Sequence, residues 1–231
     1  MRNMRFPMTR PSVKDWGMKL YRFRYSPYAR KVQALLDWLG LQYEAVEVPY
    51  ADRNELATLT GGYIYVPVLV TESGAVIKES RDICEHLAQG RGASLVPAPW
   101  EGPIWAYHDF VDGPLEDALF RIGSPAVQQA WPTPGERALY TLVKERKFGA
   151  GCVEAWLRER DVLVARARKL LAPSLRTLTQ RPFLFGDAPT VADAALLGNC
   201  LMLQEADPSL LPSLAPELVA FVERASAYRL A

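Results

Sequence analysis

The chain has 231 residues and a formal net charge of +1, from 27 basic and 26 acidic side chains. This length allows one large domain or two small ones, and the balanced charge argues against nucleic acid or an anionic membrane as a partner. The three cysteines form no CxxC pair and no Cys/His zinc spacing, so they predict no metal site and fit a reducing cytoplasm. No apolar run approaches the roughly 18 residues that a membrane-spanning helix needs.

The first segment, residues 1–17, differs from the rest of the chain. It carries three arginines before its first acid, Asp15, and prolines interrupt it. It has no apolar central region, so it is not a secretory signal. We expect a flexible extension or a misplaced start, with Met18 as the other possible initiator. A targeting role is the lesser alternative.

Residues 18–90 alternate between strand and helix patterns. Residues 18–23 read as a strand, and Ser26-Pro27 then opens a helix that Gly40 ends. Further strands and helices are expected, in order, at residues 42–48, 52–59, 66–71, 75–78 and 80–89. The resulting order, β-α-β-α-β-β-α, is that of a thioredoxin-like α/β domain with one parallel and one antiparallel pairing.

Residues 91–103 are rich in Gly and Pro and have no periodicity, so we expect a linker. Everything from 104 to 231 has helical patterns, which predict an all-helical domain. Helices are expected at residues 104–120, 136–171 (one long helix or a broken pair) and 216–224, with a kink or restart at Pro173.

Thr190 and Asp193 are expected to cap a further helix as a capping-box variant. The residues that follow, 194–203, are almost wholly apolar. This helix should therefore be buried at the centre of its domain.

The Val66-Pro67 pair stands at the head of a β-branched run. Proline lacks an N–H and does not belong in a central strand, but it fits if the bond is cis and the backbone there turns toward a ligand. Glu79-Ser80 follows where a strand ends and a helix begins. Ser80 is a good N-cap, and a helix N-terminus attracts a carboxylate. Together these residues predict a site for a peptide-like anionic ligand.

Four motifs, in this order and at these distances, resemble the glutathione S-transferase (GST) superfamily. They are Ser26–Val32, Val66–Leu69, Glu79-Ser80, and Phe183–Asp187 followed by Pro189–Asp193. The resemblance runs from about residue 18 to the C-terminus and assigns no class. It implies the GST architecture, an α/β thioredoxin-like N-terminal domain plus an all-α C-terminal domain, assembled as a homodimer.

The resemblance also implies glutathione as co-substrate. Val66, next to a cis Pro67, would pair its backbone with the cysteinyl unit. Glu79 would take the α-amino group, and Ser80 the γ-glutamyl carboxylate. Ser26 stands where thioredoxin relatives carry the first cysteine of CxxC, which excludes thiol–disulfide exchange at this turn. A hydroxyl at a helix N-terminus can instead donate to a bound thiolate and lower the thiol pKa.

Each of these roles has a plainer alternative. Ser26 would be only a helix cap, Glu79-Ser80 an ordinary helix start, and Pro67 the first residue of an edge strand. The hydroxyls that could replace Ser26 are those of Tyr21, Tyr25 and Tyr28.

Recognition of the glycine carboxylate stays open. Residues 63–65, Tyr-Ile-Tyr, stand where many relatives have a lysine. The candidate cations are Arg30, Lys31 and Arg53, with none preferred.

Other residues are expected to have structural roles. His86 and His108 read as ordinary surface or linker-side histidines, and Cys84, Cys152 and Cys200 as small apolar core residues. Four aromatic side chains either face the cleft between the domains, where an electrophile would bind, or pack in the core: Trp105, Tyr107, Phe110 and Phe120.

The sequence therefore predicts a cytoplasmic enzyme, a serine-type glutathione transferase that activates glutathione as thiolate for attack on a small hydrophobic electrophile. A glutathione-dependent lyase or etherase, isomerase or dehalogenase is a variant of the same chemistry. The alternative is a non-catalytic binding or assembly module, which the Tyr-Ile-Tyr segment favours. Deglutathionylation ranks third because Ser26 replaces the cysteine that it needs.

Overall fold

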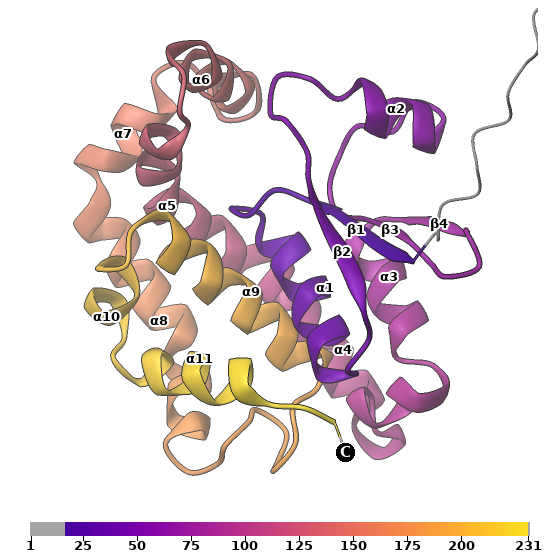
Figure 1. Cartoon of the computed structure of the whole chain (residues 1–231). Helices are drawn as coiled ribbons and strands as arrows, with labels where there is room; N and C mark the ends of the chain where they lie inside the picture. Colours follow the sequence, from indigo (N-terminus) through magenta and orange to yellow (C-terminus); the bar gives the residue numbers. More distant parts are fainter. Residues whose placement is uncertain (1–16, 231) are drawn as a thin grey trace, which may run out of the picture.

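A computed structural model describes residues 17–230 and shows a small sheet followed by a larger set of helices (Figure 1). The predicted N-terminal extension, apart from Gly17, lies outside the described residues. The elements of the first part are β1 (Met18–Arg22), α1 (Pro27–Trp38), β2 (Tyr43–Glu47), α2 (Asn54–Thr60), β3 (Val68–Val70), β4 (Val76–Lys78) and α3 (Ser80–Leu87). The predicted order of strands and helices is confirmed.

The sheet has the strand order β2-β1-β3-β4. β1 and β2 are parallel, with Leu20 opposite Ala45, because α1 provides the crossover between them. β3 runs antiparallel to β1, with Leu20 opposite Leu69, and β4 closes the hairpin with Ile77 opposite Leu69. The sheet is thus the mixed thioredoxin-like sheet that the sequence predicts.

The second part is helical. Two short 3-10 helices, η1 (Gly90–Leu95) and η2 (Ala98–Trp100), come first. They are followed by α4 (Glu101–Phe110), the π-helical turn η3 (Val111–Leu115), α5 (Glu116–Ala130), α6 (Pro134–Phe148), α7 (Cys152–Arg158), α8 (Arg160–Leu178), α9 (Val191–Ala206), α10 (Leu210–Leu214) and α11 (Glu217–Ala227). No helix within residues 17–230 is long and apolar enough to cross a membrane.

Several helix boundaries differ from the expected ones. The segment expected as one helix or a broken pair is divided into α6, α7 and α8. Gly149 and Gly151 take positive φ angles of 98° and 70°, which end α6 and precede α7. The restart expected at Pro173 does not occur, because α8 continues through that residue to Leu178.

The central position of α9 was predicted correctly. Its residues 191–200 are all buried, and it packs against α1, α4, α5 and α11 (Figure 1). At its start, Asp193 is fully buried and accepts hydrogen bonds from the Thr190 N–H (2.9 Å), the Thr190 hydroxyl (2.9 Å) and the Leu184 N–H (2.8 Å). Burial raises the pKa of Asp193 to about 6. The carboxyl therefore holds the preceding loop onto the first turn of α9.

The backbones of α9 and α1 approach each other closely at Gly198. A Cβ atom there would lie 2.4 Å from the Pro27 carbonyl oxygen and 2.8 Å from the Lys31 nitrogen. Both atoms belong to the backbone of α1, so they cannot swing aside. Only glycine allows α9 to rest directly on the first turns of α1.

Replacing Gly198 with alanine should therefore destabilise the fold. We expect Gly198→Ala to lower the free energy of unfolding by about 1–3 kcal/mol or more, the usual cost of overpacking a core. Denaturant unfolding measures the change. Gly102→Ala is the control, because a Cβ at Gly102 meets nothing within 4 Å. Equal stabilities of the two variants would contradict the close approach.

Candidate functional site

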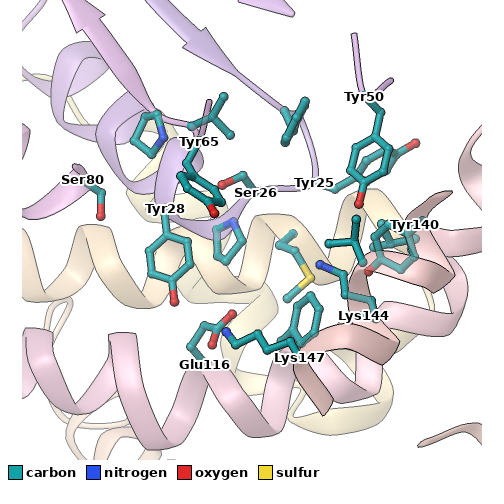
Figure 2. A pocket seen from close by; sticks show the side chains of 18 of the residues that line it. Tyr25, Ser26, Tyr28, Tyr50, Tyr65, Ser80, Glu116, Tyr140, Lys144 and Lys147 are labelled. Atoms are coloured by element: carbon teal, nitrogen blue, oxygen red, sulfur yellow. The ribbon is translucent and has the colours of Figure 1, made fainter. Parts of the chain in front are cut away.

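A cavity of about 680 Å³ lies between the sheet and the helices (Figure 2). One wall comes from the loop after β1, the loop before α2, the segment before β3 and the start of α3, while α5 and α6 supply the facing wall. The predicted site residues Ser26, Val66, Pro67, Glu79 and Ser80 all line it. Residues more than fifty positions apart in the chain thus share one space.

Ser26 lies at the N-terminus of α1, with its backbone still extended (φ −84°, ψ 114°). Its Oγ accepts a hydrogen bond from the Ala29 N–H at 3.2 Å. A hydroxyl can accept one bond and donate another. The two interpretations of Ser26, helix cap and hydrogen-bond donor to a ligand, are therefore compatible in this geometry.

The tyrosines considered in place of Ser26 separate in the structure. Tyr25 and Tyr28 line the cavity on either side of Ser26, whereas the Tyr21 hydroxyl donates to Glu55 at 3.2 Å and lies outside it (Figure 2). Burial raises the pKa of both Tyr25 and Tyr28. Their hydroxyls remain protonated at neutral pH, and Tyr28 donates to the carbonyl of Asp112 at 3.4 Å.

The Val66–Pro67 peptide bond is cis, as predicted. The strand begins at Val68 rather than Val66, because the chain turns at the cis bond before it joins the sheet. Within the described residues the N–H and C=O groups of Val66 make no hydrogen bond. An extended peptide in the cavity could therefore pair with this backbone.

Ser80 was expected to be the N-cap of α3, but it is the first helical residue, and Glu79 occupies the cap position. Glu79 has a φ of 65°, a region that non-glycine residues rarely enter and that often marks a binding site. The Tyr63 hydroxyl donates to the Glu79 carboxylate at 2.9 Å. The start of α3 thus presents a buried serine and unpaired helix N–H groups, a combination that attracts an anion.

Of the three candidate cations, Arg53 lines the cavity. Its guanidinium lies 4.8 Å from the Phe23 ring centroid and 5.2 Å from that of Tyr50, and it donates to the Ile64 carbonyl at 2.8 Å. Arg30 instead pairs with Glu205 at 2.8 Å. These contacts hold the positive charge of Arg53 at the loop before α2.

Lys31 is fully buried beneath the cavity, where α1 meets α4 and η3. Its ammonium pairs with Asp112 and lies 3.0 Å from His108 Nε2, while His108 Nδ1 lies 3.1 Å from Asp109. The expectation of a surface or linker-side residue is wrong for His108, which is 1% exposed; His86 is exposed. Burial, reinforced by Lys31, lowers the pKa of His108, so the neutral ring accepts from Lys31 and donates to Asp109.

This arrangement predicts that His108 weakens the fold in acid. Unfolded His108 takes up a proton near its ordinary pKa of 6.5, whereas the folded, buried ring does so only at lower pH. The unfolded state then binds more protons, and stability falls as the pH drops below that value, by at most about 1.4 kcal/mol per pH unit. Urea unfolding at pH 7 and pH 5 should show a smaller loss in His108→Gln than in the parent. His86→Gln, at an exposed position, should behave like the parent, and identical losses in all three would contradict the buried neutral ring.

The two alternatives for the four aromatic residues, cleft or core, are divided among them. Phe120 lines the cavity. The Trp105 ring stacks on the Arg81 guanidinium, whose Cζ lies 3.8 Å from the ring centroid. Tyr107 packs on Phe110, and its hydroxyl forms a hydrogen bond with that of Ser174. The pattern of α4 could not indicate this, because the helix has aromatic residues on more than one face.

Sequence reasoning missed several side chains on the helical wall. They are Glu116 on α5, and Tyr140, Val143, Lys144, Lys147 and Phe148 on α6. Spacing of three and four residues puts Tyr140, Lys144 and Lys147 on one helix face. No local sequence pattern indicates that this face lies across a cavity from the sheet. Within residues 17–230, no cluster of His, Cys, Asp and Glu could hold a metal ion.

Known proteins agree with this fold. Residues 20–94 match the family of the glutathione S-transferase N-terminal domain, and residues 135–228 match that of the C-terminal domain. Mouse (Mus musculus) prostaglandin E synthase 2 is 32% identical over 72 residues, which are 31% of this chain and 18% of that protein. The chain thus spans a small part of that relative.

Among solved structures, glutathione transferase GSTFuA3 from Phanerochaete chrysosporium superposes with a TM-score of 0.76 at 18% identity, covering 94% of this chain and 99% of that one. The glutathione S-transferase CsGST63524 of Ceriporiopsis subvermispora, solved in complex with glutathione, superposes with a TM-score of 0.74 at 18% identity. The match covers 90% of this chain and 97% of that one. These identities show the fold alone. With the two domain matches, they show that the chain belongs to the glutathione S-transferase superfamily.

Proposed function

We propose that the protein is a serine-type glutathione transferase, which activates glutathione as a thiolate for attack on a small hydrophobic electrophile. The observation that carries the proposal is the convergence of Ser26, the unpaired Val66 backbone and Ser80 in one cavity. These groups match three parts of glutathione: the thiol, the peptide backbone and the γ-glutamyl carboxylate.

Glutathione would lie across the sheet side of the cavity. Its γ-glutamyl carboxylate would accept from Ser80 and the N-terminus of α3, and Glu79 would take the α-amino group. The Val66 backbone would pair with the cysteinyl unit. Of the three cations considered, Arg53 is the one placed to take the glycine carboxylate, since it alone of them lines the cavity.

In this position the thiol would lie beside Ser26 and the N-terminus of α1. A thiol with an ordinary pKa of about 8.5 is mostly protonated at neutral pH. A hydroxyl donor and a helix dipole both favour the thiolate, and a fall of one to two pKa units corresponds to about 1.4–2.7 kcal/mol. The thiolate sulfur would then form a bond with the electrophilic carbon, and the thiol proton would already have left to solvent.

Ser26→Ala tests the thiolate role. We expect glutathione affinity to stay within a few-fold, because the main binding contacts are elsewhere. Turnover should fall, and the absorbance of bound thiolate should appear at higher pH. A pH titration of the glutathione complex measures this shift. An unchanged titration would transfer the role to Tyr28 or Tyr25.

Ser80→Ala tests the binding role. Loss of a charge-assisted hydrogen bond should weaken glutathione binding by roughly 1.5–3 kcal/mol in calorimetry. Ser73→Ala, in the exposed turn between β3 and β4, is the matched control and should bind as the parent does. Unchanged affinity in Ser80→Ala would contradict the assignment.

One observation favours the second candidate, a non-catalytic binding or assembly module. The Tyr63 hydroxyl already occupies one oxygen of Glu79, the group assigned to the α-amino end of glutathione. A glutathione-resin pull-down followed by a model-substrate assay separates the two functions. Retention with turnover supports the enzyme, including its lyase, etherase, isomerase and dehalogenase variants, and no retention supports the module.

The proposal includes a homodimer and a cytoplasmic location. Family membership supports the first, and three unpaired cysteines support the second. Light scattering at micromolar concentration tests the assembly.

A further inference from the structure

The helical wall of the cavity carries two lysines without an acidic partner. Lys144 and Lys147 both line the cavity from α6. The Lys144 ammonium lies 4.7 Å from the ring centroids of both Phe120 and Tyr140, and that of Lys147 lies 5.0 Å from the ring of Phe148. Within the described part of the chain neither ammonium has a carboxylate within 4 Å. Aromatic rings are their nearest recorded contacts, and Glu116 acts on them only at longer range.

The acids of the cavity do not cancel these charges. Glu79 accepts from Tyr63, and Asp112 pairs with Lys31, so Glu116 is the remaining carboxyl that lines the space. Burial raises the pKa of Glu116 to about 7, although the nearby Lys147 opposes the shift. At neutral pH this carboxyl is therefore partly protonated, and it leaves a net positive charge on this wall.

Burial also lowers the pKa of Lys144 to about 8, and the neighbouring Lys147 adds to the effect. The protein thus keeps a cation where the charged form is disfavoured. A negatively charged group bound beside it would reverse this cost, because an opposite charge within a few ångströms stabilises the ammonium.

The walls around the lysines are flat and aromatic. The rings of Phe120 and Phe148 stack with their centroids 6.0 Å apart. A second aromatic pair, Tyr50 and Trp131, also lines the cavity, with ring centroids 4.5 Å apart. Such surfaces favour a planar aromatic guest. The two lysine ammonium groups would then fix the orientation of this guest, as a few polar groups do in most small-molecule sites.

The lysines are placed for the acceptor substrate rather than for glutathione. In Figure 2 Ser80 lies on one side of Ser26, and Lys144 with Tyr140 lies on the other, while Glu116 and Lys147 come from the helical wall below. In the proposed binding mode, both carboxylates of glutathione have partners on the sheet side, at Ser80 and at Arg53. The positive charge of α6 is left for the second reactant.

We propose that the acceptor is an aromatic electrophile that carries an anionic group, such as a carboxylate or sulfonate, bound by Lys144 and Lys147. The proposal rests on the proposed transferase function and specifies its substrate class. Ser26 holds the sulfur on one side of the aromatic ring, and the lysines hold the anion on the other.

Two matched probes test the charge preference: 4-chloro-3,5-dinitrobenzoate and its neutral amide, 4-chloro-3,5-dinitrobenzamide. In each, the glutathione thiolate forms a carbon–sulfur bond, the carbon–chlorine bond breaks, and chloride leaves with the electron pair. After correction for the uncatalysed rates, kcat/KM should favour the carboxylate by about tenfold or more, the value of a charge-assisted contact. Equal or reversed preference would overturn the proposal.

Lys144→Met and Lys147→Met keep the length of the side chain and remove its charge. Each should reduce the preference for the carboxylate several-fold, and the double variant should abolish it. The fall in kcat/KM should be larger for the carboxylate than for the amide, and the KM for glutathione should change little. Arg146→Met, an exposed basic residue of the same helix that does not line the cavity, should retain the full preference.

Other outcomes have defined meanings. A raised KM for glutathione with both probes would assign the lysines to glutathione and overturn the proposal, as would an equal loss with Arg146→Met. If neither probe reacts, the transferase function fails, and binding still tests the subsite. Calorimetry without glutathione should then show 3,5-dinitrobenzoate binding more tightly than 3,5-dinitrobenzamide, and only in the presence of the lysines. Equal binding of the two compounds would exclude the anion subsite.

Discussion

The close approach of α9 to α1 at Gly198 is the constraint on which the other features depend. The missing side chain lets the two backbones touch, so the most buried helix of the second domain supports the helix whose first turn carries Ser26. A methyl group at position 198 would push α1 away and move the Ser26 hydroxyl relative to Val66 and Ser80, which are held by other elements. The position of Ser26 relative to the other two residues therefore depends on how α1 packs against α9.

The buried Lys31 is a second consequence of this contact. A cation without water is tolerable only where partners surround it, and Asp112 with neutral His108 provides them. Asp112 lies in the π-helical turn η3, a widened turn of the kind often found at functional sites. Because Glu116 follows this turn directly, the ion pair that joins the two domains also determines where α5 enters the cavity.

Local signals predicted much of the fold and part of the site. Ser26-Pro27 marked the start of α1, the apolar run of α9 marked a buried helix, and Pro67 in a β-branched segment indicated a cis bond. These signals failed where contacts with distant segments of the chain decide the structure. His108 is buried because Lys31 approaches from a distant segment, and α8 tolerates Pro173 within its packed surroundings. A role for Lys144 and Lys147 could not be predicted without knowing that α6 lies opposite the sheet.

The burial of the three cysteines has a chemical consequence for a protein proposed to hold reactive electrophiles. Cys84, Cys152 and Cys200 are all buried, and burial raises the pKa of each thiol, to about 11 for Cys84 and about 12 for Cys200. Alkylation needs an accessible thiolate, and none of these side chains supplies one. In the proposed reaction an electrophile in the cavity would meet the sulfur of glutathione, since no cysteine lines that space, so the protein's own thiols would escape alkylation.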